Sequence, residues 1–490
     1  MKKTKIICTM GPNTNDRELI KQLALNGMDI ARFNFSHGDH EEQAGRFALV
    51  KSVREEINKP IATLLDTKGP EIRTGVLKDD KKVTLKEGQK FTLTTREIVG
   101  DETIDMITYA GLPADVDNGN TILIDDGLIE LRVEEVVDGT DIVCTVINGG
   151  ELGSKKGVNV PNVSIKLPGI TDKDKDDIIF GIEQGFDFIA ASFVRNAACI
   201  QEIKQLLWEH GSDIPVIAKI ENAEGIENLD EIIKVADGIM VARGDMGVEI
   251  PAEDVPHYQK EIIKKCNATY KPVITATQML DSMMIHPRPT RAEATDVANA
   301  IYDGTSAIML SGETAAGKYP VEALHTMKTI AERAERDIDY NKRFFNRDAV
   351  QNPDITSAIS HATCTTAIDL AAAAIITVTK SGKTARMLSK YRPKCPIIGC
   401  TPVKKVARQI NLSWGVQPLL IGEENNTDDL FEHAVDAAKK HGYVKDGEVT
   451  VITAGVPLGV TGTTNLIKVH VVGHILVKGF SINERSATAP

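Results

Sequence analysis

The sequence predicts an α/β fold in which a (β/α)8 (TIM) barrel carries an all-β insert and is followed by a second α/β unit. Its 490 residues allow about three domains at roughly 150 residues each. Short β-rich apolar runs alternate with longer stretches of helical period, as in a parallel sheet covered by helices. Residues 71–168 interrupt this rhythm, because alternating runs and turn pairs there indicate antiparallel strands.

Eight strand–helix units account for the barrel. Gly27 is expected to close the first helix, Asp16–Asn26, as a left-handed cap, and the last helix is expected over Val321–Tyr340. Eight units close a barrel of typically about 250 residues, and residues 1–340 without the insert have about that length. The expected barrel strands are Lys5–Met10, Asp29–Phe35, Pro60–Lys68, Phe188–Phe193, Val216–Ile220, Gly238–Ala242, Val273–Thr277 and Ala307–Leu310.

The insert and the C-terminal unit have their own patterns. Turn pairs such as Asp126-Gly127 and Asp138-Gly139 separate the insert strands, which we expect at Lys81–Lys86, Thr121–Asp125, Glu130–Val136 and Ile142–Ile147. The C-terminal strands are expected at Ile375–Thr379, Ile397–Thr401, Gln417–Ile421, Val449–Ala454 and Lys468–Val472. The predicted division is barrel 1–70 and 169–345, insert 71–168, linker 346–354, C-terminal α/β domain 355–473 and tail 474–490.

Composition excludes several classes of protein. Acidic residues outnumber basic ones by 69 to 57, a formal charge of −12, which disfavours nucleic acid as a partner. Apolar runs are too short for a membrane span, and the basic start lacks the apolar core of a signal peptide. The seven cysteines are scattered and form no C-x-x-C pair, so reduced thiols in a cytoplasmic protein are expected.

Polar residues follow the predicted barrel strands at their carboxyl ends, where barrel enzymes place their active sites. Lys219 follows the apolar run Pro215–Ala218 and therefore emerges from the barrel core. A structural salt bridge to Asp245 or Glu221 is the alternative interpretation of this lysine. The strand-end segments are Arg32–Gly38, Asp66–Arg73, Lys219–Asn222, Arg243–Asp245, Thr275–Gln278 and Ser311–Glu313.

Two of these carboxylates indicate a metal site. Glu221 and Asp245 follow neighbouring strands, and two oxygen ligands with room for water and substrate suit Mg²⁺. Gly244 and Asp245 begin a turn toward a helix, where exposed N–H groups bind anions. Together they predict a phosphorylated or carboxylated substrate held on a divalent metal.

Two segments look like phosphate-binding P-loops but fail the pattern. Gly312–Lys318 has the required spacing, yet Tyr319 replaces the Ser or Thr that would bind Mg²⁺. Ser381–Thr384 has the required ending, but Thr377 stands where the first glycine should be. We interpret neither segment as a P-loop.

Five collinear motifs together resemble pyruvate kinase over residues 1–473. They are Ile30-Ala-Arg-Phe-Asn-Phe-Ser-His-Gly38, Leu65-Asp-Thr-Lys-Gly-Pro-Glu-Ile-Arg-Thr-Gly75, Ile217-Ala-Lys-Ile-Glu-Asn222, Val241-Ala-Arg-Gly-Asp-Met-Gly247 and Thr275-Ala-Thr-Gln-Met-Leu280. The resemblance implies phosphoryl transfer from phosphoenolpyruvate to ADP, giving pyruvate and ATP, in a homotetramer. It also implies that the insert is a β-barrel lid and that the C-terminal domain is regulatory.

The resemblance implies catalytic roles for strand-end residues. Arg32 would hold the phosphoryl group, and Lys219 would stabilise the charge on it and on the departing enolate. Glu221 and Asp245 would bind Mg²⁺ or Mn²⁺. The Gly244 and Asp245 backbone and Thr277 would receive the substrate carboxylate, and Thr277 would also help to protonate the enolate through water.

Further residues would bind the monovalent cation and the nucleotide. The resemblance implies a K⁺ cage made by Asn34, Ser36, Asp66 and the Thr67 carbonyl. The nucleotide-binding residues that it implies are Asn34, Phe35, Ser36, His37, Arg73 and Lys156, whereas Lys155 is expected to be a solvated charge. Glu71 resembles the residue of K⁺-dependent members of the family, which have Glu here where independent members have Lys; a solvated surface glutamate is the alternative.

An effector loop is implied in the C-terminal domain. Its residues are Thr379, Ser381, Gly382, Lys383 and Thr384, whose small side chains and N–H groups suit a sugar phosphate. The later stretch 454–462 lacks the basic residues that accompany a bisphosphate in relatives. A monophosphorylated sugar or a nucleotide monophosphate is therefore the expected effector.

Two other functions compete with the kinase. A metal-dependent lyase of pyruvate enolates could use the same barrel, carboxylates and Mg²⁺, but it would leave Arg73, Lys156 and the lid without a role. A non-catalytic sensor that uses only the C-terminal domain would predict decay of the barrel motifs, and these motifs are intact.

Overall fold

The computed structural model describes residues 1–346, 354–424, 426–457 and 464–474. Most of the predicted linker and the tail from residue 475 onward lie outside the described residues, as does 458–463 of the stretch 454–462. Contacts group the chain into two compact units, one of residues 1–31, 48–63 and 282–490, and the other of residues 32–47 and 64–281. The described residues contain no helix with the length and apolar character that a bilayer crossing requires.

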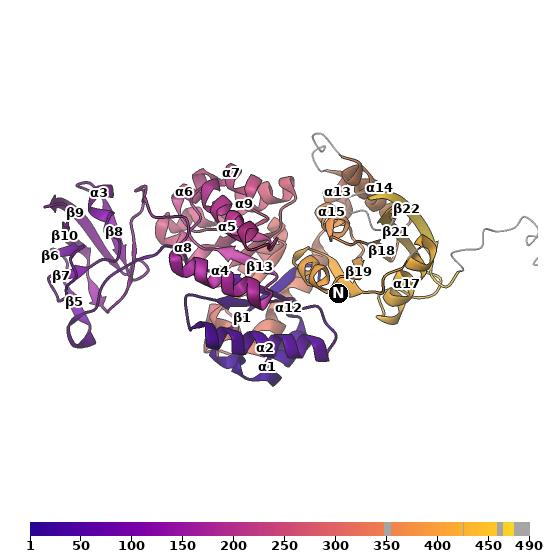
Figure 1. Ribbon diagram of the computed structural model, residues 1–490, viewed down its shortest axis with the longest axis horizontal. Helices are drawn as coiled ribbons and strands as arrows, with labels where there is room; N and C mark the ends of the chain where they lie inside the picture. Colours follow the sequence, from indigo (N-terminus) through magenta and orange to yellow (C-terminus); the bar gives the residue numbers. More distant parts are fainter. Residues whose placement is uncertain (347–353, 425, 458–463, 475–490) are drawn as a thin grey trace, which may run out of the picture. The chain divides into compact units, whose positions relative to one another are not determined.

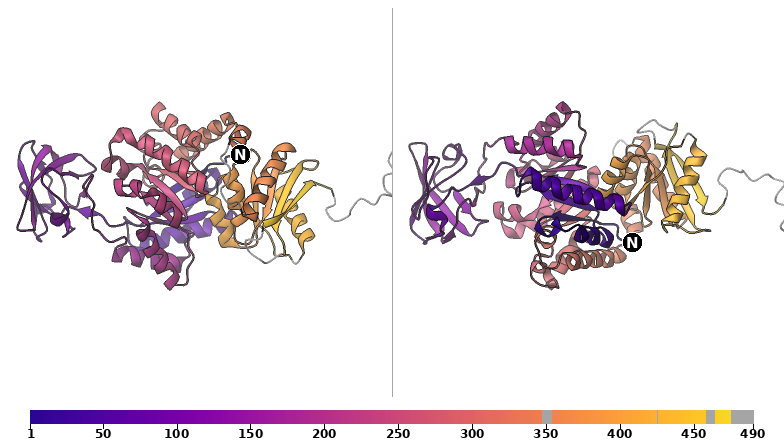
Figure 2. Two further views of the ribbon diagram at one scale, coloured as in Figure 1. Left: turned by 90° about the horizontal axis from the view of Figure 1, so that it is seen from above. Right: turned by 60° about the horizontal axis from the view of Figure 1, so that its bottom comes forward.

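The predicted eight-stranded parallel barrel is confirmed. Its strands close in the order β1-β17-β16-β15-β14-β13-β3-β2, and helices surround them (Figure 1 and Figure 2). All eight are almost completely buried because parallel strands in a barrel are covered on both faces. The strands are β1 Lys5–Met10, β2 Ile30–Asn34, β3 Ala62–Asp66, β13 Phe188–Ala191, β14 Val216–Ile220, β15 Gly238–Ala242, β16 Val273–Ala276 and β17 Ala307–Leu310.

The barrel helices have clear termination and start signals. Gly27 ends α1 with φ of +131°, a positive value as glycine allows, but outside the left-handed helical region that the sequence predicted. Thr171 starts α4 through a capping box with Asp174. The helices are α1 Arg17–Asn26, α2 His40–Glu56, α4 Asp172–Gln184, α5 Ala197–Glu209, α6 Ala223–Glu227, α7 Leu229–Val235, α8 Arg243–Glu249, α9 Val255–Thr269, α10 Arg291–Asp303, α11 Gly312–Ala315, α12 Pro320–Asp337 and α13 Tyr340–Phe345.

The insert is a separate β domain. Its main sheet has the order β4-β12-β8-β9-β10-β6-β7, and β11 pairs with β5. A bridge between Thr74 and Ile107 joins the chain beside the two edge strands, so the sheet curves until its edges meet. The elements are β4 Ile72–Arg73, β5 Val83–Leu85, β6 Lys90–Thr94, β7 Ile104–Met106, α3 Leu112–Asp115, β8 Thr121–Ile124, β9 Ile129–Val137, β10 Asp141–Asn148, β11 Gly150–Leu152 and β12 Gly157–Asn159.

The C-terminal domain is an α/β sandwich. Its five-stranded sheet has the order β20-β19-β18-β21-β22, with β22 antiparallel to β21. Ile376 of β18 packs in a core with α17, while its neighbour Ile375 packs in another core with α14 and α15, so helices cover both faces. The elements are α14 Ile355–Asp369, β18 Ala374–Val378, α15 Lys383–Tyr391, β19 Ile397–Thr401, α16 Lys404–Gln409, β20 Val416–Leu420, α17 Thr427–Lys440, β21 Val449–Gly455 and β22 Thr464–Val471.

Candidate active site

Four charged side chains meet at the carboxyl ends of β2, β3 and β14. We call Arg32, Asp66, Lys219 and Glu221 the inner cluster. Arg32 Nε donates to Asp66 Oδ2 at 2.6 Å, and Lys219 Nζ lies 3.1 Å from Asp66 Oδ1 and 2.9 Å from Glu221 Oε1. All four side chains are at most 11% exposed, so the cluster is a nearly dry network of ion pairs.

Strand register explains how the sequence brings these groups together. Ala190 of β13 lies level with Asp66 of β3, and Ala191 lies level with Ala218 of β14. Ser192 follows Ala191 and Lys219 follows Ala218, so these two residues lie side by side. Lys219 Nζ donates to Ser192 Oγ at 2.8 Å, and Ser192 Oγ donates to the Thr67 carbonyl at 2.6 Å.

Ser192 is a site residue that the sequence interpretation missed. It connects Lys219 with the predicted K⁺ ligand Thr67, and its Oγ is 3.2 Å from Asp66 Oδ1. Ser192 lies within the strand Phe188–Phe193 that the sequence predicts. Strand β13 instead ends at Ala191, so Ser192 directly follows a buried strand, as active-site residues of barrels do.

Burial and charge act in opposite directions on the inner cluster. Burial opposes a charged Lys219, but the carboxylates of Asp66 and Glu221 outweigh it and hold the lysine pKa above its ordinary value. Burial would also raise the pKa of Asp66, yet the cations of Arg32 and Lys219 hold it below its ordinary value. Burial raises the pKa of Glu221 to about 7, although Lys219 opposes the shift.

Asp245 and Thr277 lie near each other beside the inner cluster. Asp245 is in the first turn of α8, and burial raises its pKa, with Lys219 opposing. A Cβ on Gly244 would come within 2.8 Å of Thr277 Cγ2, so glycine permits this close approach. Thr277 has φ of +72°, a strained value for a β-branched residue, and Arg243 Nη2 donates to its carbonyl at 2.7 Å.

A cleft of about 620 Å³ lies between the insert and the strand ends. Arg73 and Lys156 line it, together with Glu71, Asp125 and Asp245. Arg73 binds Glu71 at 2.7 Å, and Lys156 Nζ donates to Asp125 Oδ1 at 2.9 Å. The cleft therefore offers two cations whose present partners are carboxylates at a partly exposed surface.

Some of the predicted nucleotide-binding residues line the cleft and others do not. His37 is exposed and is absent from the described lining of the cleft, whereas Arg73 and Lys156 belong to it. Phe35 is buried, and its ring packs against Phe180, Phe186 and the His40 ring. Lys155 is exposed, as expected for a solvated charge, and its carbonyl accepts from Arg73 Nη1 at 2.9 Å.

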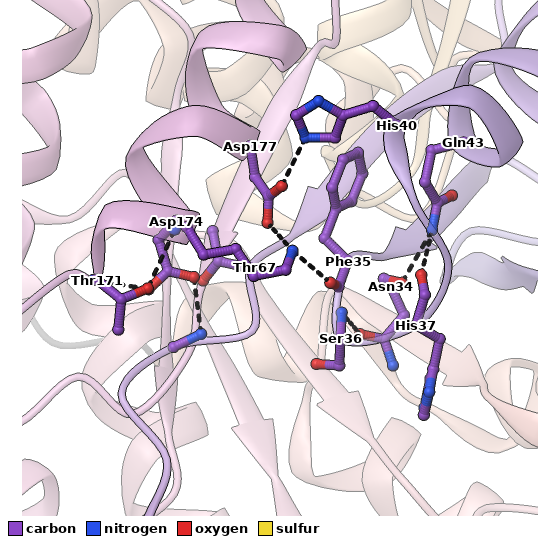
Figure 3. A network of polar contacts seen from close by, with 12 residues as sticks. Asn34, Phe35, Ser36, His37, His40, Gln43, Thr67, Thr171, Asp174 and Asp177 are labelled. Atoms are coloured by element: carbon purple, nitrogen blue, oxygen red, sulfur yellow. Dashed lines mark hydrogen bonds and ion pairs between the residues drawn. The ribbon is translucent and has the colours of Figure 1, made fainter. Parts of the chain in front are cut away.

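The predicted K⁺ ligands lie at the carboxyl ends of the adjacent strands β2 and β3, which end at Asn34 and Asp66. The Phe35 N–H donates to the Asp66 carbonyl at 2.9 Å, which joins the loop after β2 to the end of β3. The Ser36 N–H donates to Asn34 Oδ1 at 3.1 Å (Figure 3). Glu71 is only 19% exposed and paired with Arg73, which disagrees with the alternative of a solvated surface residue.

The predicted effector loop is less open than its sequence indicates. Thr379 Oγ1 accepts from the Gly382 N–H at 3.0 Å, and Thr384 Oγ1 lies 2.7 Å from Thr464 Oγ1. Thr379, Gly382 and Thr384 are buried, while Ser381 is half-buried and Lys383 is exposed. Backbone groups, Ser381 and the exposed side chains of Lys380 and Lys383 are therefore the parts of the loop that a ligand can reach.

Comparison with known proteins identifies the family. The family model described as "Pyruvate kinase, barrel domain" matches residues 1–324, and that described as "Pyruvate kinase, alpha/beta domain" matches residues 357–470. A pyruvate kinase of Clostridium acetobutylicum is 56% identical over 474 residues, which are 96% of this chain and 100% of that protein.

Two further proteins agree with this match. A pyruvate kinase of Geobacillus stearothermophilus is 54% identical over 488 residues, covering 99% of this chain and 83% of that protein. The crystal structure of a pyruvate kinase from Cryptosporidium parvum superposes with a TM-score of 0.91 at 41% identity and covers 96% of both chains.

Proposed function

The chain belongs to the pyruvate kinase family and transfers the phosphoryl group of phosphoenolpyruvate to ADP, and we propose that the inner cluster, Asp245 and Thr277 carry out this transfer. The comparisons give no support to the alternative lyase of pyruvate enolates. The observation that carries the proposal is the inner cluster itself, because it holds two cations in a nearly dry site at the strand ends.

The two cations stabilise the charge of the transferring group. Phosphoryl transfer needs little covalent help from the protein, and positioning and charge stabilisation supply most of the catalysis. Arg32 binds phosphoryl oxygens, and Lys219 neutralises charge on the phosphoryl group and on the departing enolate oxygen. Asp66 holds both cations in place, so little reorganisation is needed when the charge develops.

The other end of the substrate binds beside α8. The N–H groups of Gly244 and Asp245 lie in the first turn of this helix, where backbone donors have no carbonyl partner within the helix. Together with the Thr277 hydroxyl they receive the substrate carboxylate. Arg243 fixes the Thr277 backbone, and this hydroxyl relays a proton toward the enolate carbon through water.

We infer that Glu221 and Asp245 bind Mg²⁺ or Mn²⁺. Glu221 offers a buried carboxylate whose Oε1 is paired with Lys219 Nζ at 2.9 Å, and a carboxylate oxygen is a suitable hard ligand. No cluster of three or more potential ligands from His, Cys, Asp and Glu occurs in the described ranges, which fits an ion whose remaining ligands are water and substrate. A bound divalent ion supplies positive charge to the phosphoryl oxygens and the enolate.

Charge balance supports the need for added cations. Arg32 and Lys219 contribute two positive charges, whereas Asp66, Glu221 and Asp245 contribute three negative ones. With all five groups ionised, the site alone is net negative, although both substrates are anions. A divalent ion and K⁺ at Asn34, Ser36, Asp66 and the Thr67 carbonyl reverse this balance.

The remaining parts of the proposal concern the nucleotide, the effector and the assembly. Arg73 and Lys156 bind ADP phosphates in the cleft, which their position in its lining supports. The loop 379–384 binds a monophosphorylated sugar or nucleotide. Family membership supports a cytoplasmic homotetramer, and light scattering of the purified protein measures that assembly.

The test is formation of pyruvate and ATP from phosphoenolpyruvate and ADP, followed with and without Mg²⁺. The proposal predicts that both products form in equal amounts and that activity requires the divalent ion. Glu221→Ala and Asp245→Ala should each raise the Mg²⁺ concentration for half-maximal rate about tenfold or more. Unchanged Mg²⁺ dependence in both variants would show that the two-carboxylate site is wrong.

A further inference from the structure

Helix α4 carries charged residues that face the active-site loops instead of solvent. Asp174 and Asp177 are both 1% exposed, although the sequence of this helix alternates acidic and basic residues as a solvated helix does. Asp174 closes the capping box with Thr171, and its Oδ1 accepts from the Gly69 N–H at 2.9 Å. The start of the helix thereby holds the loop that follows β3.

Asp177 lies nearly one turn further along and holds the loop that follows β2. His40 Nε2 donates to its Oδ1 at 2.7 Å, and Lys173 Nζ donates to its Oδ2 at 2.6 Å. Lys173 Nζ also donates to the Phe35 carbonyl at 3.1 Å, so the carboxylate acts on this backbone group through the lysine. The His40 ring is stacked on Phe180 of α4 at 4.3 Å.

The Phe35 peptide lies between two of the proposed K⁺ ligands. Its N–H donates to the Asp66 carbonyl and its carbonyl accepts from Lys173, while its ring is buried against Phe180 and Phe186. A residue held at three points fixes the direction of its neighbours. Asn34 and Ser36, one on each side of Phe35, are therefore oriented by α4 through Lys173 and Phe180. Gln43 of α2 adds a donor to the Asn34 carbonyl at 3.0 Å.

We propose that Asp177 is a positioning residue for the monovalent cation: through Lys173 and His40 it fixes the Phe35 peptide and with it the oxygens of Asn34 and Ser36. This inference rests on the proposed K⁺ cage. Asp177 acts at a distance from the cage, because its own contacts are with Lys173 and His40.

Cation affinity and selectivity are the properties that such positioning controls. Ligands must be held within about 0.5 Å of their productive geometry to act well, and loss of a supporting partner typically costs about 10–100-fold in metal affinity. Loosening the Phe35 peptide should therefore weaken K⁺ binding and reduce discrimination between K⁺ and Na⁺. At saturating K⁺ the cation site is filled in every variant, so kcat should equal that of the parent enzyme.

The experiment compares Lys173→Met and Asp177→Asn with the parent enzyme. The readouts are the K⁺ concentration for half-maximal rate, the ratio of rates with K⁺ and with Na⁺, kcat at saturating K⁺ and, without substrates, the K⁺ concentration that gives half of the maximal rise in thermal midpoint. We expect the half-activating K⁺ concentration to rise about tenfold in both variants. Asp177 is buried and its variant could unfold, but Lys173 is 47% exposed at its side chain and its replacement should fold.

Asp176→Asn is the matched control, because Asp176 is an exposed carboxylate on the same helix. This control should keep the parent's K⁺ dependence, and Lys173→Arg should restore most of the affinity by keeping a donor for the Phe35 carbonyl. The inference would be overturned if the half-activating K⁺ concentration rose equally in Asp176→Asn or stayed unchanged in Lys173→Met. Either result would leave the proposed K⁺ cage itself unaffected. Full activity of the parent without K⁺ would instead refute the cage and the inference with it.

Discussion

The inner cluster and the cleft both pair cations with carboxylates, but they do so in different surroundings. Side chains of the inner cluster are at most 11% exposed, whereas those of Arg73 and Lys156 in the cleft are 38% and 36% exposed. Buried ion pairs depend strongly on each partner, while exposed pairs are weak and exchange readily with solvent or ligand. The difference indicates that the inner cluster is fixed in advance, while the cleft can exchange its carboxylate partners for phosphate.

The largest expected difference between the two regions is in stability. Asp66→Asn removes the buried carboxylate that Arg32 and Lys219 share, although Glu221 still pairs with Lys219, and breaking a buried pair costs about 3–5 kcal/mol. Asp125→Asn removes the partner of Lys156 in the cleft, and an exposed pair contributes about 0–1 kcal/mol. In urea unfolding without substrates, the free energy of unfolding should therefore fall strongly in Asp66→Asn and change little in Asp125→Asn. Equal decreases in this free energy would mean that the inner cluster is as well hydrated as the cleft.

The next effect concerns Glu71, which lines the cleft and lies five residues after Asp66, one of the proposed K⁺ ligands. Glu71→Lys replaces a negative charge by an ammonium group that could substitute for the ion. Activity in buffer containing only a bulky organic cation should rise well above that of the parent. Because the change also removes the partner of Arg73, the KM for ADP is measured alongside it. If the Glu71→Lys variant needs K⁺ as much as the parent does, Glu71 is not a cause of the K⁺ requirement.

The smallest expected effect lies in the C-terminal domain. Ser381→Glu places negative charge where an effector phosphate is proposed, and Ser381 is a better choice than the buried Thr384, which contacts Thr464. The ratio of rates with and without a sugar monophosphate should fall to about one. An unchanged thermal midpoint would exclude unfolding, and a persistent activation would exclude this loop as the effector site.

The sequence predicts the barrel well because its strands are continuous apolar runs that end in polar residues. It predicts the insert less completely, since β4, β11 and β12 have only two or three residues each and show no alternation. Pairing partners, not local pattern, define such short strands. The division into domains given by the sequence stays a prediction.

The residues of the site likewise include some that the sequence predicts and some that it does not. Lys219 and Asp66 stand out in the sequence because a charged residue beside a buried run needs a partner. Asp174 and Asp177 do not stand out, since a run of alternating charges on a helix usually faces water, and only tertiary contacts show that these two are buried. Thr384 is the opposite case, a small polar residue in a loop-like motif whose hydroxyl is already bound.

The most direct test of the inner cluster is the kcat of Lys219→Met at saturating phosphoenolpyruvate, ADP, Mg²⁺ and K⁺, with Lys155→Met as the exposed control. Loss of one stabilising donor typically lowers kcat about 10²–10³-fold, and loss of a full charge in a dry site should cost more. We expect kcat of Lys219→Met to fall by at least about 10³-fold, with a much smaller change in substrate binding. A folded Lys219→Met enzyme with near-normal kcat would show that this lysine is only a structural partner of Asp66 and Glu221.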